Sequence, residues 1–281
     1  METLHSFLNR YFKNSDANEH DNFVVEGINV NNREKIVSLT DKHNKGVDLS
    51  LVNNPVYRKL GGHDVISIFK RTKLKNGKKW DQDGNPFIYA LKEKYGWKFD
   101  ITNEEISKYL KRFLKICDKI KNHYDTIIMV PSSSDLNKRF MEAISKQVHA
   151  KNIIPNYFLK VEKEKIINLN LIDEEQIRKD FGNQSEDILD KIHTHIEESD
   201  GDYLEAKTFG KDKYLLKYIK YILPGNSENI RDKIDGKDVL ILDDTISSYS
   251  TISQCVKNID DTFLPKSLTV ITLLSGLKKR P

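Results

Sequence analysis

Residues 239–251 read Val239-Leu240-Ile241-Leu242-Asp243-Asp244-Thr245-Ile246-Ser247-Ser248-Tyr249-Ser250-Thr251. The first four are apolar without interruption, which is typical of a strand buried on both faces of a parallel sheet. An acidic pair follows, then small hydroxyl residues, and then a helical pattern over residues 250–259. The segment therefore predicts a buried strand, a polar loop and a helix in direct succession.

The chemistry of this loop suits a sugar phosphate. Loops at the carboxyl ends of parallel strands bind ligands, and the N-terminus of the following helix offers unpaired N–H groups to a phosphate. Asp243 and Asp244 can accept hydrogen bonds from sugar hydroxyls or hold Mg²⁺ through water. The expected phosphate-binding residues are Thr245, Ser247, Ser248, Tyr249, Ser250 and Thr251. The alternative left open is that the hydroxyls only cap a helix and the aspartates only form a turn.

A second loop of the same kind lies upstream. Residues 126–130 form another uninterrupted apolar run, which stops at Pro131. Three serines, Ser132, Ser133 and Ser134, then precede a helix that begins at Asp135, so the anion-binding argument applies again. An ordinary turn with a capping serine is the alternative.

The remaining pattern alternates strands and helices, which predicts an α/β protein with a mostly parallel sheet flanked by helices. Thr102 and Glu105 have capping-box spacing ahead of a long amphipathic helix. Residues 162–235 are heavily charged and predict a helical insertion or hood over the core. Further strands are expected at residues 23–30, 64–69, 156–161 and 268–274, and helices at 86–95, 102–122, 135–148, 173–181, 185–198 and 211–222.

The spacing of the apolar run, the acidic pair and the sequence Ser-Ser-x-Ser-Thr resembles the phosphoribosyl-diphosphate (PRPP) signature of type I phosphoribosyltransferases. The resemblance implies a Rossmann-like type I phosphoribosyltransferase fold over residues 56–281, preceded by an N-terminal extension, residues 1–55, of unassigned role. It also implies that Asp243 and Asp244 hold the ribose hydroxyls and that the hydroxyl loop holds the 5-phosphate. Tyr249 stands where the family commonly has Gly, which tolerates backbone conformations that other residues resist.

Residues 86–275 also resemble the competence-associated ComF type of this family. By that likeness, Lys92 and Arg139 neutralise the diphosphate leaving group together with the serine loop. The implied activity is Mg²⁺-dependent transfer of a phosphoribosyl group from PRPP to a nitrogenous base, with release of diphosphate. From the residues alone, the alternative for Lys92 and Arg139 is a solvated helix surface, which such basic residues more often occupy.

Two alternatives to an enzyme remain open, because a fold does not fix a function. One is a non-catalytic regulator that binds PRPP or a nucleotide, such as a ComF-like or phage-defence accessory protein. The other is nucleic-acid binding through the basic residues 70–80, which the sequence does not favour because that cluster also fits a solvated loop.

The composition narrows the class of protein to which the chain can belong. The 281 residues carry a formal net charge of only +4, with acidic and basic residues mixed along the chain. Cys117 and Cys255 fit no disulfide or metal pattern, and no segment approaches the roughly 20 apolar residues of a membrane span. We expect a cytoplasmic protein without a membrane partner, and a homodimer stays open. His193 and His195 predict surface residues and no metal site, since they would not share a helix face.

Overall fold

The computed structural model describes residues 26–41, 46–71, 84–120, 123–132, 135–204, 208–246 and 249–275. Several residues selected from the sequence lie outside these ranges: Ser133, Ser134, Ser247, Ser248 and residues 72–80 of the basic cluster.

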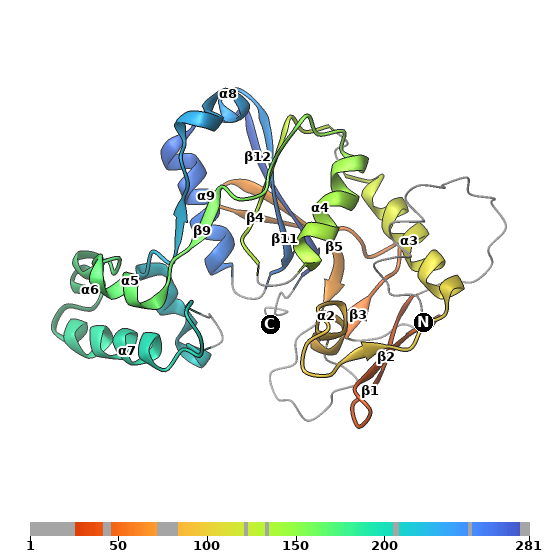
Figure 1. The fold of residues 1–281 in the computed structure, drawn as a ribbon, viewed down its shortest axis with the longest axis horizontal. Coiled ribbons are helices and arrows are strands. Elements are labelled where there is room, and N and C mark those ends of the chain that lie inside the picture. Colours follow the sequence, from red (N-terminus) through yellow and green to blue (C-terminus); the bar gives the residue numbers. More distant parts are fainter. Residues whose placement is uncertain are drawn as a thin grey trace.

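A seven-stranded sheet forms the centre of the described chain (Figure 1). Five of its strands are parallel and lie in the order β5 (His63–Arg71), β12 (Ser267–Leu274), β11 (Asp238–Thr245), β7 (Thr126–Met129) and β8 (Asn152–Ile154). Two antiparallel strands, β3 (Val47–Asp48) and β4 (Val56–Leu60), pair with β5. The predicted α/β class with a mostly parallel sheet is confirmed.

The strand order reverses between β7 and β11. From β7 the chain continues to its outer neighbour β8, and from β11 it continues to β12 on the opposite side. The connections that leave these two adjacent strands therefore diverge, which opens a crevice at their carboxyl ends. Both loops selected from the sequence begin at this point.

Helices cover both faces of the sheet. Leu240 and Leu242 of β11 belong to the core beneath α2 (Asn85–Leu91), α3 (Asn103–Cys117) and α4 (Leu136–Gln147). Val239 and Ile241 belong to the opposite core, beneath α9 (Ser250–Thr262). The capping box of Thr102 and Glu105 is present, as predicted. No helix in the described part of the chain has the length and apolar character needed to cross a membrane.

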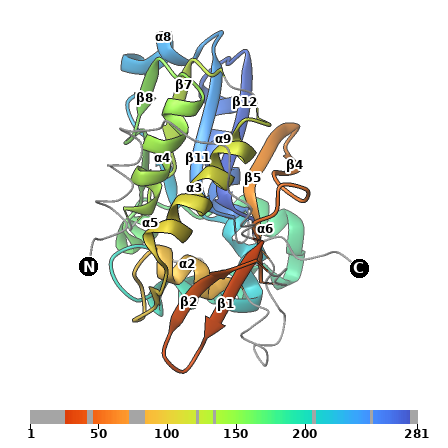
Figure 2. The same cartoon turned by 90° about the vertical axis from the view of Figure 1, so that its right-hand side faces the viewer.

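The N-terminal region contributes a small second sheet beside α2 (Figure 2). Strands β1 (Gly27–Asn31), β2 (Ile36–Thr40) and β6 (Lys98–Phe99) form it. Ile28 and Val37 are fully buried in the same core as the residues of α2. The strand expected at residues 23–30 begins at Gly27, and residues 23–25 lie outside the described ranges.

A helical segment extends away from the sheet between two short strands (Figure 1). Strands β9 (Phe158–Lys160) and β10 (Ile222–Pro224) pair antiparallel at its base, and α5 (Lys163–Asn168), α6 (Glu174–Phe181) and α7 (Ser185–Glu197) follow β9. The chain returns through the 3-10 helix η3 (Gly210–Tyr218) and then, after β10, through η4 (Glu228–Ile230) and α8 (Arg231–Ile234). A further 3-10 helix, η2 (Gly182–Gln184), joins α6 to α7.

One sequence prediction in this region is confirmed and one is wrong. The strand expected at residues 156–161 forms as β9 and pairs with β10, whereas the parallel strand that follows α4 in the central sheet is β8. The α-helix expected at residues 211–222 is the 3-10 helix η3 followed by β10, with a non-helical kink at Asp212. The backbone amides of Tyr221 and Ile222 bond to a side chain of α9, so they are withdrawn from any helical ladder.

That side chain is Gln254, which fixes the base of the helical segment to α9. Its Oε1 accepts hydrogen bonds from the amides of Tyr221 (3.2 Å) and Ile222 (3.1 Å). Its Nε2 donates to the carbonyls of Leu216 (3.3 Å) and Ile219 (2.5 Å). One side chain therefore bonds to four backbone groups and holds Tyr221 in place. The amide of Tyr221 also donates to the carbonyl of Ile219 (3.2 Å), and the amide of Ile219 to that of Leu216 (3.3 Å).

Replacing Gln254 with Leu keeps the side-chain volume and removes all four hydrogen bonds. Because partly buried backbone groups lose their partners, we expect the free energy of unfolding to fall by about 2–4 kcal/mol in urea denaturation. Asn258→Leu is the matched control on the same helix, since Asn258 makes one such bond, to the carbonyl of Ile222 (3.2 Å). Equal losses in the two variants would contradict this account.

Candidate functional site

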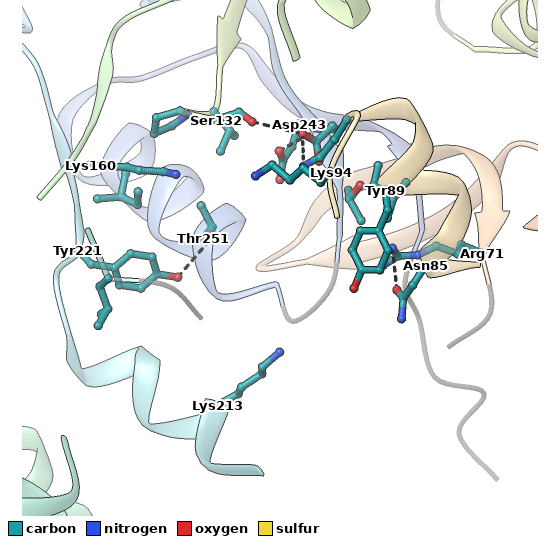
Figure 3. A pocket seen from close by; sticks show the side chains of 18 of the residues that line it. Arg71, Asn85, Tyr89, Lys94, Ser132, Lys160, Lys213, Tyr221, Asp243 and Thr251 are labelled. Atoms are coloured by element: carbon teal, nitrogen blue, oxygen red, sulfur yellow. Dashed lines mark hydrogen bonds and ion pairs between the residues drawn. The ribbon is translucent and has the colours of Figure 1, made fainter. Parts of the chain in front are cut away.

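A cleft of about 380 Å³ lies at the carboxyl ends of β7 and β11 (Figure 3). Four parts of the chain line it: the end of β5 with α2 and the turn after it, the loop after β7, the base of the helical segment, and β11 with α9. The lining residues are Arg71, Asn85, Ile88, Tyr89, Lys92, Lys94, Tyr95, Val130, Pro131, Ser132, Lys160, Leu204, Lys213, Tyr221, Ile222, Asp243, Asp244, Thr245 and Thr251.

The acidic pair belongs to the strand and not to the loop that the sequence predicted. β11 continues to Thr245, so the sheet itself holds Asp243 and Asp244 in place. Oδ1 of Asp243 accepts hydrogen bonds from its neighbour's amide (2.8 Å) and from Nδ2 of Asn137 (3.3 Å). Asn137 also donates to the carbonyl of Val130 (3.0 Å), and it thereby ties the end of β11 to the end of β7.

The environment of Asp243 favours its protonated form. Desolvation by the surrounding protein, followed by the negative charge of Asp244, raises the pKa of Asp243 from 3.8 to about 7. The charge of Lys92 and the hydrogen bonds from Asn137 and the Asp244 amide act in the opposite direction. Asp243 therefore gains and loses its proton near neutral pH.

Asp244 is neutralised by a lysine. Its side chain is only 5% exposed, and its Oδ2 lies 2.7 Å from Nζ of Lys92. The hydroxyl of Ser132 donates to the same oxygen at 3.4 Å. Lys92 reaches this position because α2 ends at Leu91, four residues earlier than predicted, and a tight turn follows. Residues from α2, β11 and the loop after β7 therefore meet at one carboxylate.

The first turn of α9 forms another part of the cleft wall. Oγ1 of Thr251 lies 3.2 Å from the hydroxyl of Tyr221, which comes from the base of the helical segment. Burial raises the pKa of Tyr221, and the hydrogen bonds of Ser250 and Thr251 oppose this shift. Thr245 also lines the cleft, and its buried Oγ1 has no hydrogen-bond partner among the described residues. This end of the cleft is rich in hydroxyl groups beside a helix N-terminus.

Tyr249 adopts the backbone conformation that glycine favours. It precedes α9 with φ 60° and ψ −16°, in the left-handed region, and its ring packs against the core beneath α9. This conformation costs a residue with a Cβ about 1–2 kcal/mol. The turn at the start of α9 therefore forms with a Tyr at this position, at a cost in folding free energy.

The structure brings six of the predicted site residues together: Lys92, Ser132, Asp243, Asp244, Thr245 and Thr251 all line the cleft. Tyr249 and Ser250 flank it without lining it. Arg139 is half-buried on α4 and does not line it either, and its Nε has no hydrogen-bond partner among the described residues. The structure therefore does not place Arg139 with Lys92.

Most of one wall and part of another were not expected from the sequence. Asn85, Ile88 and Tyr89 lie at helical spacing on one face of α2, and Lys92, which was expected, follows at the C-cap of this helix. That spacing could have indicated the wall. No local pattern marks the other lining residues from distant segments, namely Arg71, Lys94, Tyr95, Lys160, Leu204, Lys213, Tyr221 and Ile222.

The histidines of the helical segment form no metal site. Nε2 of His195 lies 3.3 Å from a carboxylate oxygen of Asp212. Among the described residues, no three His, Cys, Asp or Glu side chains are grouped so that they could hold a metal ion.

The raised pKa of Asp243 predicts a pH-dependent stability. A proton on Asp243 favours the folded state, so this contribution is complete below the ordinary pKa of 3.8 and is lost as the pH rises through about 7. Asp243→Asn keeps an oxygen that can accept both hydrogen bonds, but its amide has no proton that titrates in this pH range. Between about pH 5 and about pH 8 we expect the urea midpoint of the wild type to fall and that of Asp243→Asn to stay nearly level. The exposed Asp261→Asn should follow the wild type, and a wild-type slope in Asp243→Asn would refute the assignment.

The left-handed conformation of Tyr249 predicts that two variants at this position differ in stability. Tyr249→Ala and Tyr249→Gly both remove the packed ring, but only glycine relieves the positive φ. We therefore expect the glycine variant to unfold with a free energy about 1 kcal/mol larger than that of the alanine variant. Thermal and urea denaturation of both variants measure the difference. An alanine variant as stable as the glycine variant would show that the turn carries no strain.

Comparison with known proteins does not assign the chain to a family. No protein-family model and no curated protein sequence matches the chain. The arrangement of side chains in the cleft is therefore the basis for its functional interpretation.

Proposed function

We propose that the chain is a phosphoribosyltransferase of Rossmann-like type I fold, which transfers a phosphoribosyl group from PRPP to a nitrogenous acceptor and releases diphosphate. One observation carries the proposal. An acidic pair ends β11 at the point where the strand order reverses, and a hydroxyl-rich helix N-terminus and a serine-bearing loop line the same cleft. Each element suits one part of PRPP.

The phosphate end of the ligand would lie at α9. The hydroxyls of Thr251 and Tyr221 and the helix N-terminus provide donors for a phosphate dianion. The carboxylate of Asp244 would accept hydrogen bonds from the ribose hydroxyls. Ser132 and Lys92 both contact Oδ2 of this carboxylate and suit the diphosphate.

The cleft suits a Mg²⁺ ion only when the phosphates of the substrate supply further ligands. The two adjacent carboxylates of β11 are too few to enclose the ion, but Mg²⁺ is commonly bound by one or two carboxylates together with substrate phosphates and water. Asp243 and Asp244 would hold it on the protein side. When bound, Mg²⁺ neutralises the negative charge that develops on the departing diphosphate.

The reaction requires no covalent nucleophile from the protein. The C1–oxygen bond to diphosphate breaks while the acceptor nitrogen forms its bond to C1, so positive charge develops on the ribose. The carboxylates of β11 stabilise that charge, and the chain positions the two reactants. In this structure Lys92 forms an ion pair with Asp244. When the diphosphate group binds, Lys92 would pair with the diphosphate instead. The carboxylate of Asp244 would then be able to accept hydrogen bonds from the ribose hydroxyls.

A second candidate is a regulator that binds PRPP or a nucleotide without turnover. The ion pair between Lys92 and Asp244 favours it, because the carboxylate needed for ribose is already engaged. Calorimetry followed by a diphosphate-release assay over purine, pyrimidine and nicotinamide acceptors separates the two candidates. Binding with release supports the enzyme, whereas binding without release supports the regulator. The nucleic-acid hypothesis stays a prediction, because residues 72–80 lie outside the described ranges.

Asp244→Asn tests the role that both candidates share. The neutral amide is a weaker acceptor for the ribose hydroxyls than the carboxylate and leaves Lys92 without its ion pair, so we expect calorimetry with PRPP and Mg²⁺ to give affinity at least about tenfold weaker, or about 1.4 kcal/mol. The exposed Asp261→Asn is the matched control and should bind as the wild type does. Failure of the wild type to bind PRPP, or unchanged binding when both Asp243 and Asp244 are replaced with Asn, would exclude both candidates.

A further inference from the structure

We infer that α2 and the turn after it bind the acceptor, and that the acceptor is a flat ring bearing a negatively charged substituent. This inference rests on the proposed function, since it assigns the second substrate of the same cleft.

The lining residues of α2 and of the turn after it, called the α2 wall, lie opposite the hydroxyl groups of the cleft. Figure 3 shows Asn85 and Tyr89 across the cleft from Ser132, Tyr221 and Thr251. If those three residues hold the phosphate groups of PRPP, the α2 wall faces the side of the ribose that the diphosphate leaves open. An acceptor atom must approach C1 from that side for the bond to form as the diphosphate departs.

Aromatic side chains give this wall an affinity for rings. Tyr89 of α2 and Tyr95 of the following turn both line the cleft, with ring centroids 5.1 Å apart and an interplanar angle of 86°. Tyr95 is 59% exposed, so more than half of its surface is accessible to a ligand. A planar ligand can stack on one ring while its edge meets the other, in the geometries that aromatic pairs prefer.

The turn that carries Tyr95 is held in a costly conformation. Glu93 has φ 53° and Tyr95 has φ 57°, both in the left-handed region. Nζ of Lys35, from the N-terminal sheet region, donates to the carbonyl of Tyr95 (2.7 Å), and the amide of Lys94 donates to the carbonyl of Tyr89 (2.9 Å). Such strain persists only where surrounding contacts enforce it, and it concentrates at ligand sites.

The positive charge of the α2 wall favours a ring with a negatively charged substituent. Arg71 and Lys94 line this side of the cleft beside Lys92, whose charge is paired with Asp244, and none of the described residues that line it from β5, α2 or the turn is acidic. Gly84 allows Arg71 to lie here, because a Cβ at residue 84 would come within 2.3 Å of its Cγ. Nη1 of Arg71 donates to Oδ1 of Asn85 (3.3 Å), which holds the guanidinium at the wall. A carboxylate on the ring would complement this charge.

Two matched pairs of probes test charge without changing ring shape: nicotinate against nicotinamide, and orotate against uracil. Each probe is titrated calorimetrically into the full chain, with and without saturating ribose 5-phosphate and Mg²⁺. We expect the charged member of at least one pair to bind about tenfold or more tightly than its neutral partner. Lys94→Met should reduce that ratio to below about twofold, and Tyr95→Leu should weaken both members of the pair by a similar factor.

Control variants separate a local effect from a general one. Lys151→Met and Tyr214→Leu change exposed residues of the same types that do not line the cleft, and both should bind as the wild type does. Equal affinity for charged and neutral rings, no ring binding, or no effect of Lys94→Met would overturn the inference while ribose 5-phosphate still binds. Failure of the wild type to bind ribose 5-phosphate would instead count against the proposed function, and the titrations of the rings alone would still report charge selection.

Discussion

The parallel pairing of β11 with β7 is the constraint on which the cleft depends. Their register joins Val239 to Thr126 and Leu242 to Met129, and the amide of Val130 continues it by donating to the carbonyl of Leu242 (2.9 Å). Because the two strands send the chain in opposite directions, a crevice forms at their carboxyl ends. Asn137 then donates both to the carbonyl of Val130, directly after β7, and to the carboxyl group of Asp243, near the end of β11. The acidic pair is thus held by the sheet, which is more rigid than a loop.

Each remaining wall of the cleft is attached to this sheet by a different means. α2 is packed through buried apolar residues that share a core with β11 and with the N-terminal sheet. The base of the helical segment is attached through polar groups as well, since Gln254 of α9 bonds to the backbone of residues 216–222. Hydrogen bonds are directional, so this second attachment fixes Tyr221 beside Thr251 more closely than apolar contact alone would.

The charges at the centre of the cleft balance in the absence of ligand. Lys92 neutralises Asp244, and desolvation keeps Asp243 near its point of protonation at neutral pH. Two uncompensated carboxylates on adjacent residues would repel each other strongly at this depth. A ligand that brings both hydroxyl groups and anions can exchange partners with both residues, and a sugar phosphate has both kinds of group.

Several parts of this architecture follow from the sequence because they depend on local chemistry. Uninterrupted apolar runs predicted β7 and β11 as buried parallel strands, and the spacing of Thr102 and Glu105 predicted the start of α3. The hydroxyl residues after Asp244 predicted a polar link into a helix, and α9 begins at Ser250. Helical periodicity failed for η3, because the amides of Tyr221 and Ile222 find their partner in Gln254, more than thirty residues later along the chain.

The sequence by itself determined the α/β class, the buried strands, and the acidic pair with its hydroxyl loop, since these depend on residues adjacent along the chain. Only the tertiary structure decided that Lys92 meets Asp244, that Arg139 stays outside the cleft, and that Tyr89 and Tyr95 form a wall opposite Thr251. It also decided that Tyr249 takes the left-handed conformation expected of glycine. These outcomes depend on packing between segments far apart in sequence, and local propensity carries no information about such contacts.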